Sequence, residues 1–201
     1  MSSYSLPAHA VEHRSPRVAR RRERMKAALV AAGVHQFADR GIERVSVADL
    51  IAEADVSRAT FYGFFSSKYN LLENILDPIF EVAIGAIRAL ADRPAPDALA
   101  GLIDVYVRLW REHREGLLLI PAVNLETFSH FRAQHESLND AMLAVLTRAE
   151  NAGLLRNGSA RYSLKVIAKT AIPLLRVYDG HPGADSLFRD AMSSLLIGAE
   201  K

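Results

Sequence analysis

The sequence predicts an all-α protein of about nine helices, in which an N-terminal helix-turn-helix domain precedes a larger helical domain. Apolar residues recur at intervals of three and four through most of the chain, which is the spacing of an amphipathic helix. Cap residues and helix-ending Gly or Pro divide this pattern into separate helices. Residues 46–68 add two short helices joined by a tight turn. These observations divide the chain into a disordered tail (1–14), a helix-turn-helix domain (15–68) and a helical domain (69–201).

The composition is that of a globular protein from a reducing compartment. Half of the 201 residues are hydrophobic and 24% are charged, which suits a packed core and a hydrated surface. The absence of cysteine excludes disulfides, thiolate zinc sites and cysteine nucleophiles. The N-terminus lacks the apolar run of a secretory signal, and no apolar stretch is long enough to span a bilayer. We therefore expect a cytoplasmic protein that does not associate with a membrane.

Positive charge is concentrated near the N-terminus. Residues 1–68 contain eleven Lys or Arg against seven Asp or Glu, whereas residues 69–201 contain fourteen against sixteen. Most of the excess lies between Arg14 and Lys26, where Glu23 is the only acidic residue. A basic run alone is as often a solvated helix surface as a binding site. Beside a helix-turn-helix, contact with DNA phosphates is the better interpretation.

The first helix is expected to begin at Pro16 and to end at Arg40. Ser15 and Pro16 form a cap followed by an N1 proline, and Gly41 supplies the left-handed residue that often ends a helix. The apolar residues of this helix form one stripe, which should pack on the two short helices that follow: Leu29, Val30, Gly33, Val34 and Phe37. The basic residues extend from its N-terminal end.

The two short helices of residues 46–68 have clear starts and a polar turn. Ser46 followed by Asp49, and Ser57 at the second start, are N-cap signatures. Asp55 tolerates the left-handed backbone that such a turn usually needs. The spacing gives the second helix an inward face of Phe61, Phe64 and Phe65 and an outward face of Arg58, Ala59, Tyr62 and Gly63. A helix-turn-helix of this shape is the element that enters a DNA major groove.

The remaining chain is predicted to be a series of amphipathic helices. A long helix follows Lys68 and contains Pro78, which we interpret as a packing bend rather than a hinge. Further helices are expected from Asp97 to about His113, over about 131–152, from a cap at Ser159 to Gly180, and from Asp185 onward. The last helix is apolar on more than one face, and these faces need two surfaces against which to pack.

The segment from about Arg24 to Leu72 resembles the DNA-binding domain of the TetR family of bacterial transcriptional regulators. The matching motifs occur in the family's order and spacing: FADRG at 37–41, SVADLIAEADVS at 46–57, RATFYGFF at 58–65 and SKYNLL at 67–72. Asp55 replaces the usual turn glycine, and Gly63-Phe64 stands where the family often has a larger residue followed by histidine. Gly63 should destabilise the short helix by roughly 0.5–1 kcal/mol relative to alanine.

The resemblance implies roles for residues of the helix-turn-helix. Arg58 would reach base edges such as guanine O6 and N7, and Ala59 would contact a thymine methyl group. Phosphates would be held by hydroxyl and ammonium groups, namely those of Ser46, Thr60, Tyr62 and Lys68. The alternatives are a core aromatic for Tyr62 and an ordinary helix residue for Lys68. The full DNA-binding set expected is Arg20, Arg21, Arg22, Arg24, Ser46, Ser57, Arg58, Ala59, Thr60, Tyr62, Gly63, Phe64 and Lys68.

For the helical domain, the resemblance implies an effector pocket and a twofold dimer. The pocket candidates are large or polar residues on inward faces of the middle helices, although a plain core residue is the better interpretation of each one taken singly: Phe80, Ile84, Tyr106, Trp110, Asn124 and Met142. The last two helices would pair with those of a second copy as a four-helix bundle. Their interface candidates are Leu164, Ile167, Ala171, Leu175, Leu187, Phe188, Ala191 and Leu195.

We therefore interpret the sequence as that of a ligand-responsive dimeric regulator, most consistent with a repressor that a small hydrophobic molecule releases from a palindromic operator. Its expected partners are double-stranded DNA, that effector and a second copy, and no cofactor, metal site or catalytic residue is expected. A ligand-independent DNA-binding protein is the alternative that stays open. A helical enzyme is disfavoured because the sequence shows no nucleophile elbow, phosphate loop, metal cluster or paired catalytic carboxylates at motif spacing.

Overall fold

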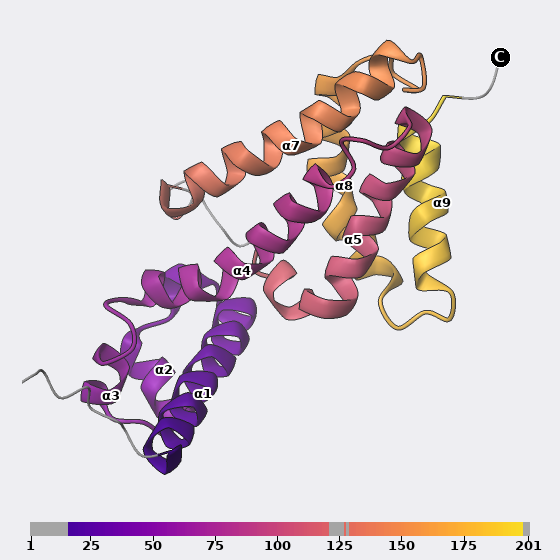
Figure 1. Ribbon diagram of the computed structural model, residues 1–201. Helices are drawn as coiled ribbons and strands as arrows, with labels where there is room; N and C mark the ends of the chain where they lie inside the picture. Colours follow the sequence, from indigo (N-terminus) through magenta and orange to yellow (C-terminus); the bar gives the residue numbers. More distant parts are fainter. Residues whose placement is uncertain (1–15, 121–126, 128, 199–201) are drawn as a thin grey trace, which may run out of the picture.

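The computed structural model describes residues 16–120, 127 and 129–198, and these residues are all-α (Figure 1). Eight α-helices and two 3₁₀ helices have both ends within the described residues, and no β-strand occurs among them. The first elements are α1 (Pro16–Arg40), η1 (Ile42–Arg44), α2 (Val47–Glu53) and α3 (Arg58–Tyr62). They are followed by α4 (Lys68–Arg88), α5 (Ala95–Leu117), η3 (Ser129–Phe131), α7 (Arg132–Asn151), α8 (Ala160–Tyr178) and α9 (Ala184–Leu196). The predicted fold class is confirmed.

The elements from α1 to α3, which we call the head, form a three-helix unit around the apolar stripe of α1. Leu29 and Phe37 are fully buried and belong to the same apolar core as Leu50 of α2 and Phe61 of α3. The bounds of α1 are those predicted. The helix ends before Gly41, whose φ of 80° is a conformation that glycine adopts at little cost.

Local capping builds the helix-turn-helix as predicted. Ser46 and Asp49 form a capping box, in which Ser46 Oγ accepts the Asp49 N–H at 3.2 Å and the Asp49 carboxylate accepts the Ser46 N–H at 2.8 Å. Ser57 starts α3 by accepting the N–H of Thr60 at 3.1 Å. Between the two helices, Asp55 has a φ of 49°, which is the left-handed conformation expected for the turn.

α4 connects the head to the helices from α5 to α9, which we call the body (Figure 1). It packs closely on α1, because a Cβ atom added to Gly33 would lie 2.9 Å from Leu71 Cδ2. It remains one helix across Pro78, which lies on its exposed side. Proline lacks an N–H, so the carbonyl of Asn74 loses its usual helical donor without a break in the helix.

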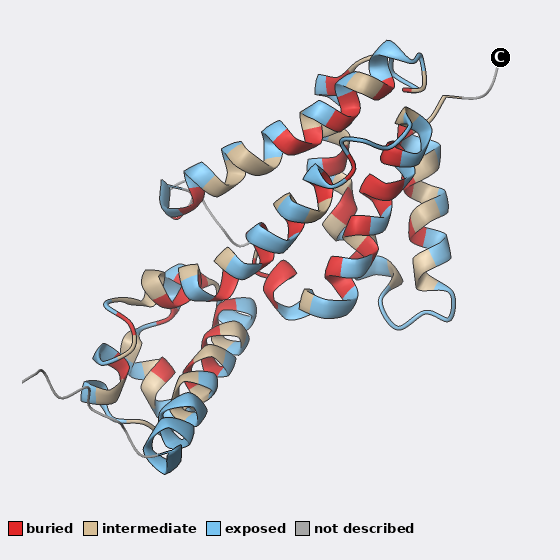
Figure 2. Cartoon of the chain, viewed as in Figure 1, coloured by how far each residue is buried: buried red, intermediate tan, exposed pale blue. Residues whose placement is uncertain are grey.

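The body is a helical bundle with a continuous apolar interior. α4 packs against α5 and α7, α8 packs against α7 and α9, and α5 also contacts α7, α8 and α9. Figure 2 shows the buried residues on the facing sides of these helices and the exposed residues on their outer sides. Within the described part of the chain, no helix is long and apolar enough to cross a membrane.

Two predicted helix boundaries in the body are wrong. α5 begins before Asp97, because a proline precedes the helix and a second proline occupies its first turn. The helix end predicted at about His113 coincides with a break, because His113 has a non-helical φ of −136° before the last helical residues to Leu117. α9 begins directly after Gly183, whose φ is 85°, and Asp185 forms an ion pair with Arg111 instead of capping the helix.

Candidate nucleic-acid interface and internal cavity

α3 presents a small exposed face to solvent. Arg58, Ala59 and Tyr62 are exposed, and Tyr62 keeps 50% of its surface accessible. Phe61 is fully buried behind them, and the Tyr62 ring meets it edge-on with ring centroids 5.3 Å apart. Tyr62 is therefore not a core aromatic. The helical spacing correctly predicted which of these side chains point outward.

The hydroxyl groups in the predicted interface hold the starts of two helices. The Ser57 and Thr60 hydroxyl oxygens are 2.8 Å apart, and Ser46 Oγ donates to Asp49 Oδ2 at 2.6 Å. The hydrogen bonds from the Ser46 side chain and backbone, followed by one from Arg40, lower the pKa of Asp49 to about 2. These bonds order the backbone that supports the exposed face of α3.

Lys68 uses its N–H donors inside the molecule. Its Nζ lies 2.9 Å from the carbonyl oxygen of Ile42 and 3.1 Å from those of Glu43 and Val45, and its side chain is 17% exposed. An ammonium group has three donors, so these bonds use all of them. The phosphate contact expected of Lys68 has no donor left in this arrangement. We correct its role to that of holding η1 against the start of α4.

Phe64 belongs to the predicted inward face only in part, because it packs against the apolar core but remains partly exposed. α3 ends at Tyr62, so the helical period no longer applies at Phe64, which is half-buried. Its ring lies under the guanidinium of Arg22, with Arg22 Cζ 4.3 Å from the ring centroid. Arg22 Nη2 also donates to the carbonyl of Gly63 at 3.0 Å.

The other arginines of the predicted set lie on the N-terminal turns of α1. Arg20, Arg21 and Arg24 are exposed, and the first buried residue of the helix is Leu29. Figure 1 shows this end of α1 and α3 together at the end of the molecule that is far from the body. Positive charge and the exposed face of α3 therefore occur on the same end of the head.

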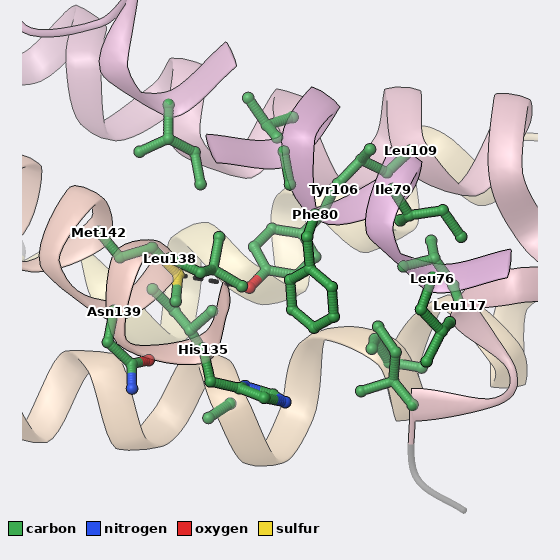
Figure 3. A pocket seen from close by; sticks show the side chains of 17 residues that line it. Leu76, Ile79, Phe80, Tyr106, Leu109, Leu117, His135, Leu138, Asn139 and Met142 are labelled. Carbon is green, nitrogen blue, oxygen red and sulfur yellow. Dashed lines mark hydrogen bonds between the residues drawn. The ribbon is translucent and has the colours of Figure 1, made fainter. Parts of the chain in front are cut away.

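An apolar cavity of about 130 Å³ lies between α4 and the body helices α5, α7 and α8 (Figure 3). Phe80, Tyr106 and Met142, three residues of the predicted pocket, line it. Burial raises the pKa of Tyr106, so its phenol stays neutral, and its hydroxyl lies 3.5 Å from Met142 Sδ. Most of the remaining wall is aliphatic, with Leu76 and Leu109 as examples.

Two polar residues outside the predicted set, His135 and Asn139 of α7, also line the cavity. Figure 3 shows them near Met142, on the opposite side of the view from Leu76. The His135 ring meets Phe80 edge-on with centroids 5.0 Å apart, and burial lowers the pKa of its imidazole, which is therefore neutral at pH 7. The spacing of His135 and Asn139 from Met142 puts all three on one helical face, a signal that the sequence did contain.

Two other pocket candidates lie outside the cavity wall. Ile84 and Trp110 are not among the residues that line the cavity, which corrects the prediction. Trp110 Nε1 donates to Asp179 Oδ1 at 3.2 Å, because an indole N–H that is largely buried needs an acceptor. Hydrogen bonds from Arg114 and, to a lesser extent, from Trp110 lower the pKa of this carboxyl. Asn124 lies outside the described residues.

The residues predicted for a dimer interface divide into inner and outer groups. The inner residues are at most 4% exposed and cannot meet a second copy, which corrects the prediction for Ile167, Ala171, Leu175 and Phe188. Leu164 and Ala191 are half-buried. The inner stripe of α8 faces its own chain, and helical spacing alone does not show which apolar face does so.

Outward-facing apolar residues do occur on α8 and α9. Leu187 and Leu195, both in the predicted interface, are 36% and 39% exposed. Tyr162 and Val177 on α8 were not predicted and are more exposed still, at 62% and 74%. These four are the large apolar side chains that the described residues of α8 and α9 leave exposed.

A capped helix-turn-helix with an outward-facing second helix is an element that enters the DNA major groove. Residues 29–75 match the sequence profile described as "Bacterial regulatory proteins, tetR family".

Individual proteins resemble this chain in sequence over about a third of its length and in fold over most of it. Over 68 residues the chain is 38% identical to the HTH-type transcriptional regulator EthR of Mycobacterium tuberculosis, a match that spans 34% of this chain and 32% of EthR. A tetR-family regulatory protein from Rhodococcus RHA1 has a TM-score of 0.71 at 19% identity, covering 88% of this chain and 98% of that one. The ketosteroid transcriptional regulator KstR2 of M. tuberculosis has a TM-score of 0.72 at 18% identity, covering 87% and 95%. Identities this low establish the fold alone.

Proposed function

We propose that the protein is a dimeric, ligand-responsive repressor that a small, largely apolar molecule releases from a palindromic operator. Residues 15–68 would form the DNA-binding domain, and residues 69–201 would bind the effector and a second copy. One observation carries the ligand-responsive part of the proposal. Residues from Thr127 to His135 both line the cavity and contact η1 of the head and the first turns of α4, which carry the head.

The cavity side of this stretch is aromatic. Phe131 is fully buried and stacks on Phe80 with ring centroids 6.0 Å apart, and His135 meets the same ring. Phe80 and His135 both line the cavity. Because protein interiors are close-packed and transmit strain, a ligand that displaced Phe80 would also displace η3 and the start of α7.

The other side of the stretch makes polar contacts with η1 of the head and with the first turns of α4, which carry the head. The buried Thr127 hydroxyl donates to Glu43 of η1 at 3.0 Å, and Tyr69 donates to the same carboxylate at 2.9 Å. His130 bonds Glu73 at 2.9 Å and stacks on Tyr69 with ring centroids 5.1 Å apart. A shift of this stretch would therefore reorient the head. In a dimer it would change the distance between the two α3 helices, which must match about 34–36 Å on DNA.

On the DNA side, α3 would enter the major groove. Arg58 would read a base edge, Ala59 would contact a thymine methyl group and Tyr62 would bind a phosphate. The exposed arginines of α1 would neutralise further phosphates beside it: Arg20, Arg21 and Arg24. In the dimer, the exposed apolar residues of α8 and α9 would be covered by those of the second copy.

The cavity indicates the chemistry of the effector. Its volume of about 130 Å³ is close to that of an engineered cavity of roughly 150 Å³ that binds benzene, and below the roughly 300–1,000 Å³ of sites for drug-sized ligands. We therefore expect an uncharged, mainly apolar molecule with one hydrogen-bonding group facing His135 and Asn139. A ligand larger than a single ring must displace side chains such as Phe80 or Met142.

The experiment is selection of bound sequences from random DNA, followed by a screen for compounds that release the protein from the selected operator. We expect a palindrome bound by a dimer, and release by uncharged apolar compounds. The matched variant Ala83→Met narrows the cavity, since Ala83 lines it and is 5% exposed. It should keep operator affinity and lose release. Failure to enrich any sequence would contradict DNA recognition, and an operator that no apolar compound releases would favour the ligand-independent alternative.

A further inference from the structure

The first turns of α1 extend beyond the core of the head. Every residue from Pro16 to Arg24 is exposed, and burial begins only at Leu29. We call residues 16–24 the basic arm. Its charged residues are Arg17, Arg20, Arg21, Arg22, Glu23 and Arg24. None of the arm's side chains is buried, so no buried side chain anchors the arm to the core of the head.

The charges of the basic arm oppose its helical structure. Arg17 and Arg21 are four residues apart, as are Arg20 and Arg24, so like charges lie beside one another on the helix and destabilise it. The first turn of α1 contains no acidic residue, and cations are unfavourable at the positive end of the helix dipole. Interactions outside the arm are needed to hold it in a defined position.

Arg22 supplies such an interaction by reaching the end of α3, 41 residues away in sequence. α3 has five residues, and Gly63 directly after it accepts the Arg22 hydrogen bond at 3.0 Å. Carbonyl groups at a helix C-terminus lack helical donors and favour a nearby cation. The guanidinium also lies over the Phe64 ring at 4.3 Å, which is the geometry of a cation–π contact. One side chain thus joins the arm to the residues that end α3.

We propose that Arg22 is a positioning residue for DNA recognition: through Gly63 and Phe64 it locks the basic arm to α3, so that both approach DNA as one unit. The proposal rests on the DNA binding proposed above. It removes Arg22 and Phe64 from the expected DNA contacts and leaves phosphate binding to the other arginines of the arm. It also gives a reason why Gly63 and Phe64, the departures from the usual family pattern, are compatible with an ordered α3.

The test compares Arg22→Gln with Arg21→Gln, a control that removes the same charge from a neighbouring exposed position of the arm. Arg21→Gln should weaken binding to the operator and to random DNA alike. It should also make the negative slope of log K against log salt shallower by about 0.9, because one phosphate contact is lost. Arg22→Gln should leave that slope unchanged on random DNA. It should weaken operator binding by about thirtyfold, the lower limit expected for a cation–π contact together with one charge-assisted hydrogen bond.

A second measurement needs no DNA. The backbone N–H groups of Phe64 and Phe65 both donate to the carbonyl of Phe61 at 2.9 Å, so their hydrogen exchange reports on the end of α3. Arg22→Gln should accelerate this exchange several-fold, and Arg21→Gln should not. Phe64→Leu should reproduce the effect of Arg22→Gln, and combining the two changes should add little.

The outcomes separate this proposal from the proposed function. If Arg22→Gln lowers the salt slope as the control does and leaves exchange unchanged, Arg22 is a phosphate contact and the positioning role is wrong. If the unaltered protein selects no DNA sequence, the proposed function fails. The exchange measurement then still decides whether Arg22 orders the end of α3, and unchanged exchange in Arg22→Gln would overturn that contact as well.

Discussion

Replacing Lys68 by methionine should destabilise the head more than it weakens contact with DNA. Methionine keeps an unbranched apolar stem but removes the charge and the N–H donors that bind the carbonyls of Ile42, Glu43 and Val45. The bond to Glu43 is exposed, so water can replace it, whereas the bonds to Ile42 and Val45 are partly buried. The main loss therefore comes from two carbonyl groups left without a donor.

The expected magnitude follows from these two bonds. A hydrogen bond to a charged group contributes about 1.5–3 kcal/mol, and the lower limit applies here because the site is partly hydrated. The free energy of unfolding should therefore fall by about 3 kcal/mol. For a chain of this size, that corresponds to a decrease in Tm of about 6–12 °C.

Thermal unfolding and the salt dependence of DNA binding together test this reasoning. Lys169→Met is the matched control, because Lys169 is exposed on α8 and its replacement should change stability by less than about 0.5 kcal/mol. DNA binding should be measured where both variants are folded, and the salt slope of Lys68→Met should equal that of the unaltered protein. A variant that keeps its Tm and loses about 0.9 from the salt slope would refute the structural role and restore the phosphate contact.

Three further predictions concern DNA reading, assembly and pH. Arg58→Ala should weaken operator binding by about 1–3 kcal/mol and relax one base position, and equal losses on operator and random DNA would exclude base reading. Leu195→Glu should convert a sedimenting dimer to a folded monomer because Leu195 is 39% exposed, whereas Leu175→Glu should unfold the chain because Leu175 is 4% exposed. The folded state lowers the pKa of Asp49 from 3.8 to about 2, so the stability it contributes is complete above 3.8 and is lost as pH falls toward 2. Asp49→Asn should flatten this part of the curve of unfolding free energy against pH, and an unaltered curve would contradict the role of the capping box.

Local signals predicted the head well. The caps at Ser46 and Ser57 each accept an N–H three residues further on, so both partners lie within one turn of sequence. The left-handed residue Asp55 follows from backbone sterics in the same way. In the body, the signals were weaker. Asp97 and Asp185 were predicted as N-caps because aspartate is a common cap, but Pro94 precedes α5 and Gly183 precedes α9.

The candidate sites were predicted only in part. Phe80, Tyr106 and Met142 were identified as pocket residues because large side chains on inward faces are candidates for any interior site. Trp110 satisfied the same criterion, yet it lies at Asp179, because a hydrogen-bond acceptor from another helix determines where its ring points. His135 was not predicted, although its spacing from Asn139 and Met142 places all three on the face of α7 that lines the cavity.

The sequence by itself determined that the chain is all-α, that it carries a helix-turn-helix, and which face of α3 is exposed. These properties depend on periodicity and caps, which act between residues at most a few turns apart. Only the tertiary structure decided that Lys68 binds η1, that Arg22 holds the end of α3 and that the stripe of α8 containing Leu175 faces its own chain. Each of these contacts joins residues from different helices. A local pattern states that a side chain is apolar or charged, whereas the partner it meets depends on how the helices pack.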